Sequence, residues 1–266
     1  MGLINTITIQ LPEKNERLER FGFRFSNGAH ISKTMMLDEI TKLLTTNPIN
    51  ATIEQYQIAI IRDNLLSKET QSSRRKTFKY LRGLYGLDGS LPLFSIYREL
   101  VHFDMKSFPL LSLLICWARD PLLRASTSAI FQVNFGDEVK KEVIQQTIMD
   151  SFPNKYSQSS LGTTSRNISS TWRQSGHLIG KKTKIRNHVN ATPTSVTFAL
   201  LLADICGYHG NQLFTSPYCK MLDLNSITAQ SLAAQAHREN LITLKTIGTI
   251  VEISFNQYKQ YLEGME

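Results

Sequence analysis

Cysteine is scarce in this sequence: the 266 residues include only three, Cys116, Cys206 and Cys219. Their positions are unrelated, so they do not form a disulfide framework, and such sparse usage is typical of the reducing cytoplasm. Long apolar runs are missing too, because the longest, 108–118, is far shorter than the roughly 20 residues that a membrane helix needs. Residues 1–11 lack the basic start and apolar centre of a secretion signal. We therefore expect a cytoplasmic protein without a membrane segment.

The motifs of common catalytic sites are also missing. The sequence has no Walker loop and no GxGxxG, GxSxG or HExxH motif, and its basic stretches hold no carboxylate pair for metal-dependent cleavage. Cys206, His209 and Cys219 could supply three metal ligands, but no fourth lies beside them. No carboxylate partner is evident for His30, His102, His177, His188 and His237. We expect a non-enzymatic chain without catalytic residues, metal or cofactor.

Acidic residues are outnumbered: 22 Asp and Glu stand against 30 Lys and Arg, which gives a formal charge of +8. Ordinary proportions of hydrophobic (41%) and charged (20%) residues exclude wholesale disorder, and the length fits two or three compact units. The basic residues are concentrated. Residues 151–203 hold seven and no acid, and residues 67–86 hold six and one acid. Two such patches favour a polyanionic partner, although two solvated faces would give the same pattern.

Hydrophobic periodicity predicts a mainly α-helical fold with two winged helix-turn-helix-like units, each carrying a small β-hairpin. Helices are expected at 35–44, 53–65, 72–85, 93–103, 108–118 and 121–131, and a short arm or edge strand at 4–11. Thr52 and Asp120 are expected to cap the helices that follow them. We divide the chain into a helix-turn-helix-like unit (1–90), a central apolar helical hub (91–135), a basic winged helix-turn-helix (136–190) and a C-terminal winged-helix unit (191–266).

The basic winged unit is predicted from the order helix, turn, helix, hairpin. A helix at 137–148 is followed by a turn at 152–154 and by a second helix, which Ser157 or Ser159 caps. Its buried stripe is expected to contain Leu161, Ile168 and Trp172. Residues 177–186 alternate around Gly180 and are expected to form the wing.

The outward residues of the second helix and the wing are the candidate contacts to double-stranded DNA. Such a helix enters the major groove, while the wing follows a neighbouring row of phosphates. The candidates are Arg166, Asn167, Ser170 and Arg173 on the helix and Lys181, Lys182, Lys184 and Arg186 on the wing. Arginine and asparagine suit base edges, and serine suits phosphate. If about five to seven cations engage, log affinity should fall with log salt at a slope of roughly −5 to −6.

Alternatives remain for these side chains. Arg166 or Arg173 could instead form an ion pair with the acids of the preceding helix. A second candidate surface is the 72–85 helix, where Arg74, Arg75 and Lys79 could face phosphates or simply solvent.

The C-terminal unit repeats the same element order. Helices are expected at 194–206, 217–222 and 226–240, and strands at 241–244 and 249–255 with a hinge at Gly248. The long helix exposes a nearly neutral set of side chains: Gln230, Gln235, His237, Arg238 and Glu239. This unit is therefore a better candidate for docking a protein than for binding phosphates.

Four stretches resemble a family of bacterial proteins found in phage-defence islands. They are Leu65-Leu66-Ser67-Lys68 with Ser72-Ser73-Arg74-Arg75, Leu81-Arg82-Gly83-Leu84-Tyr85-Gly86-Leu87-Asp88, Ala118-Arg119-Asp120-Pro121-Leu122-Leu123-Arg124, and Ser169-Ser170-Thr171-Trp172-Arg173-Gln174-Ser175-Gly176-His177-Leu178. Together they look like the BrxA family of BREX systems, in layout over most of the chain after residue 30. The resemblance implies an all-helical protein with winged helix-turn-helix units that binds double-stranded DNA, and it brings no catalytic residues.

These observations predict a non-enzymatic, sequence-tolerant DNA-binding accessory protein of a prokaryotic phage-defence system of the BREX type. A subunit that docks other defence proteins and an RNA-binding protein are the alternatives.

Overall fold

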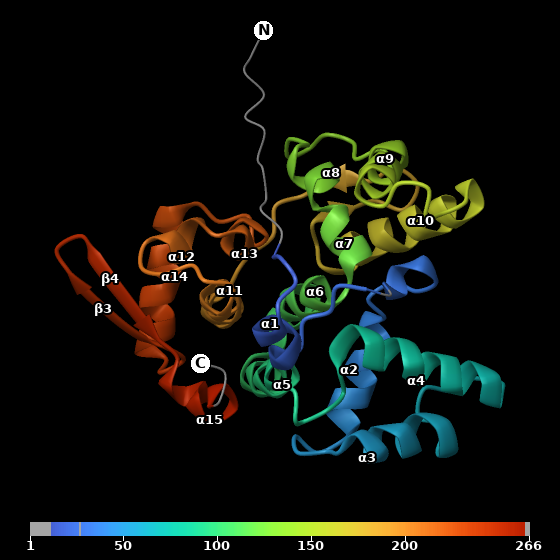
Figure 1. The fold of residues 1–266 in the computed structure, drawn as a ribbon, viewed down its shortest axis with the longest axis horizontal. Helices are drawn as coiled ribbons and strands as arrows, with labels where there is room; N and C mark the ends of the chain where they lie inside the picture. The colour runs from blue at the N-terminus through green and yellow to red at the C-terminus, as the bar shows by residue number, and fades with distance from the viewer. Residues whose placement is uncertain (1–11, 27, 264–266) are drawn as a thin grey trace, which may run out of the picture.

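The computed structural model describes residues 12–26 and 28–263 and shows a mainly helical protein with two small two-stranded antiparallel hairpins (Figure 1). The expected fold class is confirmed. The arm or edge strand expected at 4–11 lies outside the described residues. Among the described residues, no helix combines the length and the apolar composition that crossing a bilayer requires.

The N-terminal part consists of short helices followed by the longer α4. Its elements are α1 (Glu16–Phe21), the 3₁₀ turn η1 (Ala29–Ile31), α2 (Leu37–Thr46), α3 (Ile53–Gln57), the π-helical turn η2 (Ile58–Arg62) and α4 (Gln71–Tyr85). Thr52 caps α3 as predicted, in a capping box with Gln55. The expected helix at 53–65 widens into η2, where the Asp63 amide donates to the Ile58 carbonyl.

The centre of the molecule is strongly apolar. It contains α5 (Pro92–Phe103), the 3₁₀ turn η3 (Met105–Ser107), α6 (Phe108–Arg119), α7 (Pro121–Ala125) and α8 (Thr127–Phe131). Residues 110–119 of α6 are all buried, and α5 and α11 (Pro193–Ile205) pack against this helix (Figure 1). Asp120 caps α7 as predicted, because its side chain accepts the amide hydrogens of Leu122 and Leu123.

The segment that follows has the expected order of helix, turn, helix and hairpin. It contains α9 (Lys141–Ser151), α10 (Gln158–Gln174), β1 (Leu178–Ile179) and β2 (Ile185–Arg186). Helices α9 and α10 pack against each other, and β1 packs on α10. Ser157 is the N-cap of α10, as one of the two predicted alternatives. We call this helix pair with its hairpin the basic winged unit, and residues 178–186 the wing.

The same order recurs at the C-terminal end. After α11 the chain forms α12 (Gln212–Thr215), α13 (Pro217–Lys220), α14 (Ser226–Arg238), β3 (Thr243–Ile247), β4 (Ile250–Ser254), the 3₁₀ turn η4 (Asn256–Tyr258) and α15 (Lys259–Leu262). The hairpin turns at Gly248 as expected, with Ile247 opposite Ile250. Helix α14 packs on α11, and through α11 and α6 this unit shares one hydrophobic core with the rest of the described chain. The boundaries of the four sequence-derived units stay a prediction.

Candidate nucleic-acid interface

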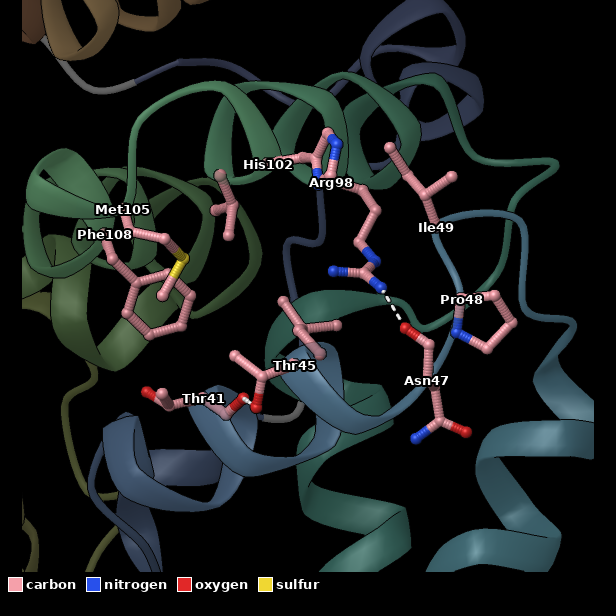
Figure 2. A pocket seen from close by; sticks show the side chains of 11 residues that line it. Thr41, Thr45, Asn47, Pro48, Ile49, Arg98, His102, Met105 and Phe108 are labelled. Atoms are coloured by element: carbon pink, nitrogen blue, oxygen red, sulfur yellow. Dashed lines mark hydrogen bonds between the residues drawn. The ribbon is translucent and has the colours of Figure 1, made fainter.

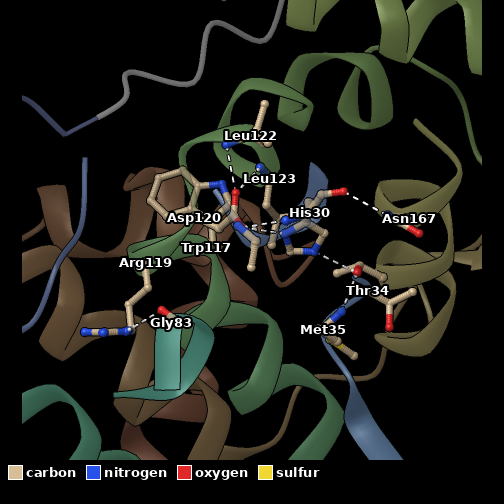
Figure 3. A network of polar contacts seen from close by, with 12 residues as sticks. His30, Thr34, Met35, Gly83, Trp117, Arg119, Asp120, Leu122, Leu123 and Asn167 are labelled. Carbon is tan, nitrogen blue, oxygen red and sulfur yellow. Dashed lines mark hydrogen bonds and ion pairs between the residues drawn. The ribbon is translucent and has the colours of Figure 1, made fainter. Parts of the chain in front are cut away.

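Helix α10 is anchored on its inner side by a buried polar network (Figure 3). The His30 Nδ1 lies 2.8 Å from an Asp120 carboxylate oxygen, and its Nε2 lies 2.8 Å from the Thr171 hydroxyl of α10. The Met35 amide donates to the same hydroxyl. Burial alone would raise the pKa of Asp120, but the His30 ring and the backbone amides around it outweigh burial and lower the pKa. The expectation that His30 has no carboxylate partner is therefore wrong.

This network has the atom order of a hydroxyl, imidazole and carboxylate triad, the arrangement that activates a nucleophile in many hydrolases. Its surroundings do not suit that chemistry. His30 and Thr171 are fully buried, Asp120 is 1% exposed, and the Thr171 oxygen already accepts a backbone amide. The network joins η1, α7 and α10, and its evident role is to hold α10 in place.

The C-terminal end of α10 is fixed in a similar way. The Trp172 indole donates to the Ser126 hydroxyl, and the ring packs edge-on against the His177 imidazole. Both side chains are fully buried. Burial lowers the pKa of His177 to about 4, because the charged form of the ring would lose its solvation by water. Its Nε2 hydrogen meets the Met221 carbonyl, which links α10 to the C-terminal unit.

The outer face of α10 keeps a narrow solvent-exposed stripe. Arg166 and Arg173 are exposed, and Ser170 between them is half-buried. Neither arginine forms an ion pair with a described residue, so the alternative that they pair with acids of α9 finds no support. The assignment of Asn167 as a base contact is corrected. Its side chain faces η1, and its amide donates to the His30 carbonyl (Figure 3). That bond removes Asn167 from the candidate base contacts.

Two of the three lysines of the wing are exposed, and the third is half-buried. Lys181 and Lys182 are exposed at the hairpin turn, whereas Lys184 folds back and donates to the carbonyls of Gly180 and Lys181. Partial burial and the nearby positive charge of Arg173 lower the pKa of Lys184. The wing therefore lies close to the exposed stripe of α10. Gly180 makes this turn possible: its φ is +88°, and a Cβ there would lie 2.2 Å from the Thr183 carbonyl oxygen.

Arg186 does not face solvent, which corrects its assignment as a phosphate contact. The side chain is 2% exposed and makes a bidentate ion pair with Asp223, which follows α13. Its guanidinium also lies 4.8 Å from the ring centres of both Phe131 and Phe135. Arg186 therefore joins the wing to the C-terminal unit and is unavailable to a duplex.

The base of the wing pairs with the segment before α9. The Arg186 amide donates to the Asp137 carbonyl, the Val139 amide donates to the Lys184 carbonyl, and Glu138 pairs with Ile185 across an antiparallel bridge. The exposed carboxylates of Asp137 and Glu138 thus lie beside β2 and reduce the positive potential at the base of the wing. The exposed cations of this unit therefore lie at the turn of the wing and along α10.

On the second predicted surface, α4, some basic side chains are exposed, and one forms hydrogen bonds with main-chain carbonyls. Arg75 and Lys79 are exposed, and Arg82 continues the same face one turn later. Arg74 is half-buried and donates to the carbonyls of Lys68 and Ile61, so it stabilises the entry to α4. Its assignment as a phosphate contact stays a prediction.

A groove brings the two basic stretches of the sequence together. Its lining includes Lys79 and Tyr80 from α4, Lys155 and Tyr156 from the α9–α10 loop, and Arg24, and the groove encloses about 650 Å³. The described residues that line it include no acid. We call it the lysine–tyrosine groove. Lysines that line a groove are suited to bind the phosphates of a nucleic-acid backbone. The sequence analysis did not select Arg24, Tyr80, Lys155 or Tyr156. The repeated Lys-Tyr dipeptide was the available indication.

The C-terminal unit presents a different surface. Gln230, His237, Arg238 and Glu239 are exposed as expected, while Gln235 is half-buried. The most exposed large apolar residues here are Ile247 (77%) and Ile250 (71%) at the tip of the hairpin, and Ile227 (77%) on α14. A hairpin with an apolar tip is suited to bury it against another protein.

The three residues considered as metal ligands have separate partners. The Cys206 thiol contacts the Tyr218 hydroxyl, the Cys219 thiol contacts the Leu213 carbonyl, and His209 faces Asp204. Within the described ranges, no three His, Cys, Asp or Glu side chains gather closely enough to share a metal ion. Comparison of the chain with protein-family models and with curated protein sequences finds no match.

Proposed function

We propose that this chain is a non-enzymatic, sequence-tolerant double-stranded DNA-binding protein that acts as a cytoplasmic accessory subunit of a prokaryotic phage-defence system of the BREX type. The observation that carries the DNA-binding part is a set of exposed cations on one rigid unit: Arg166, Arg173, Lys181 and Lys182. None of them has an ion-pair partner among the described residues. Unpaired cations of this kind release the counterions condensed on a duplex, which drives binding to any sequence.

Sequence tolerance follows from which side chains remain available. The side chain best suited to read adenine, Asn167, donates its amide to the His30 carbonyl. Lys181 and Lys182 at the wing turn are suited to phosphate oxygens, which are the same at every base pair, and Arg166 and Arg173 can bind the same oxygens as well as guanine. The phage-defence assignment itself is supported by the four stretches that resemble the BrxA family.

Charge reversal at the wing turn tests the proposal. The double variant K181E/K182E should weaken binding of a fluorescent duplex at least about tenfold at low salt, because two phosphate contacts become repulsive. The matched control is K245E/K259E, which makes the same change in net charge at two exposed lysines of the C-terminal unit. Equal binding by the wing variant and the wild type, or an equal loss in the control, would remove the wing from the interface.

Docking of a protein partner is the second candidate function, and the exposed Ile247 and Ile250 pair favours it. It predicts no retention on heparin together with stoichiometric co-purification of a defence-system partner, and loss of that partner in I247E/I250E. Competition between the duplex and a structured RNA in the same binding assay separates DNA binding from the RNA-binding alternative.

A further inference from the structure

A second cavity lies on another part of the molecule, between the end of α2, the loop after it, α5 and η3 (Figure 2). It encloses about 390 Å³, a size suited to a small molecule. Leu44, Val101 and Phe108 supply apolar walls, and the exposed Ile49 and Met105 extend them toward solvent. None of the cations of the candidate nucleic-acid interface lines this cavity.

One buried cation distinguishes this cavity from an ordinary apolar hollow. Arg98 is 6% exposed and lines the cavity from α5, and Figure 2 shows its side chain running toward the α2–α3 loop. One guanidinium nitrogen donates to the Asn47 carbonyl over 2.7 Å. The Nε is buried and has no hydrogen-bond partner among the described residues, and no described carboxylate pairs with Arg98.

A buried guanidinium without an anion is an unusual state for a protein interior, because burial removes the water that would otherwise solvate it. The other cavity residues do not supply the missing charge. Among the described residues that line the cavity there is no Asp or Glu, and His102 is the one further ionisable group. The Thr41 and Thr45 hydroxyls donate to main-chain carbonyls of their own helix. Among the described residues, no carboxylate therefore neutralises the Arg98 guanidinium.

We propose that this cavity binds a small apolar carboxylate, whose carboxylate group pairs with Arg98 while its hydrocarbon or aromatic body lies against Leu44, Val101 and Phe108. The planar fork of the guanidinium is suited to a carboxylate, and the apolar walls are suited to a body without further polar groups. This site is separate from the proposed DNA-binding surface and does not depend on it.

Isothermal titration calorimetry of the full chain with decanoate tests the proposal, with decanol as the uncharged probe of the same length. Decanoate should bind at least about tenfold more tightly than decanol, because only the carboxylate forms the charge-assisted bond with Arg98. In protein carrying methyl-labelled methionine, decanoate should shift the Met105 signal, since Met105 lines the cavity. No binding of decanoate, equal binding of decanol, or an unshifted Met105 signal would overturn the proposal.

Substitution of Arg98 also removes its bond to the end of α2, so a variant that leaves Arg98 intact is the better test. Thr45 is exposed and lines the cavity, so T45E places a competing carboxylate beside the guanidinium. It should weaken decanoate binding at least about tenfold. The matched control is T46E, because Thr46 is exposed on the same helical turn but does not line the cavity, and it should bind decanoate like the wild type. Unchanged binding by T45E would overturn the proposal.

Discussion

His30 and Asp120 form a fully buried pair in which the ring nitrogen and the carboxylate oxygen are 2.8 Å apart, although 90 residues separate them in the chain. The Asp120 carboxylate also accepts the main-chain amides of Ala29, His30, Leu122 and Leu123. One side chain thus caps α7, fixes η1 and orients the ring that contacts α10. The position of the candidate DNA-binding helix depends on this contact.

Replacing Asp120 should therefore destabilise the whole chain. The variant D120N keeps the shape but removes the charge that His30 and the four amides face, and we expect a loss of about 3 kcal/mol in the free energy of unfolding. Urea unfolding followed by circular dichroism measures it. As a control, D63N removes an exposed carboxylate and should change stability by less than about 0.5 kcal/mol. A similarly small change in D120N would show that the pair contributes little.

Because His177 is buried, we expect the stability of the fold to decrease at a pH above the range where carboxylates titrate. Its folded pKa of about 4 lies below the ordinary value of 6.5, so the unfolded chain takes up a proton first as pH falls. Stability should be fully present above pH 6.5 and decrease toward pH 4, by about 3 kcal/mol from this residue. Unfolding by urea at pH 7 and pH 5 should differ less in H177Q than in the wild type. The exposed His188 provides the control, because H188Q should retain the wild-type difference.

Arg186 should be required for stability and not for DNA contact. In R186M the Asp223 carboxylate stays buried without its partner, and we expect a loss of about 3 kcal/mol. Duplex affinity, corrected for the folded fraction, should stay within about twofold of the wild type because no phosphate contact is removed. A stable R186M protein with much weaker binding would restore Arg186 to the interface.

The number of exposed cations sets the salt dependence of binding. With Arg166, Arg173, Lys181 and Lys182 engaged, the logarithmic slope should be about −4 rather than the roughly −5 to −6 expected from the sequence, because Arg186 is buried and Lys184 is folded back. Fluorescence anisotropy over a salt series measures this slope. A slope near zero would contradict phosphate contact by this surface.

The lysine–tyrosine groove makes a separable prediction. Lys155 lies just before α10, whose 17 residues span about 25 Å, and Arg173 lies near the other end of this helix. If one duplex lies along α10 and reaches this groove, the slope steepens to about −5 or −6, and K79E/K155E reduces it by about two. K42E/K76E makes the same charge change at exposed lysines that do not line the groove. An unchanged slope in K79E/K155E would place the groove outside the interface.

Local sequence information was sufficient for most of the helices. The apolar repeats of α5 and α6 set their extents closely, and the caps at Thr52, Asp120 and Ser157 depend on side chains within three residues of the amides they accept. Such contacts are visible in a linear pattern because both partners are neighbours in the chain. The two hairpins were also predictable, since glycine occurs at each of their turns.

Tertiary partners decided the parts that the sequence could not predict. The sequence predicted Arg186 as an exposed cation of the wing. The side chain is buried instead, because it pairs with Asp223, which lies 37 residues later in the chain. Asn167 looked outward on a helical wheel, but η1 covers that side of α10, and Arg74 is similarly bound to carbonyls before its own helix. The convergence of Lys79 and Lys155 has the same origin, because it depends on how α4 meets the α9–α10 loop.

The backbone bonds between β2 and residues 136–139 have a kinetic consequence. Because β2 is hydrogen-bonded on both sides, the hairpin loses little conformational entropy when a polyanion binds. Binding therefore does not require a slow step that orders the surface. Capture should then proceed close to the limit set by diffusion and long-range attraction. Added ions should act chiefly by slowing arrival at this prearranged surface.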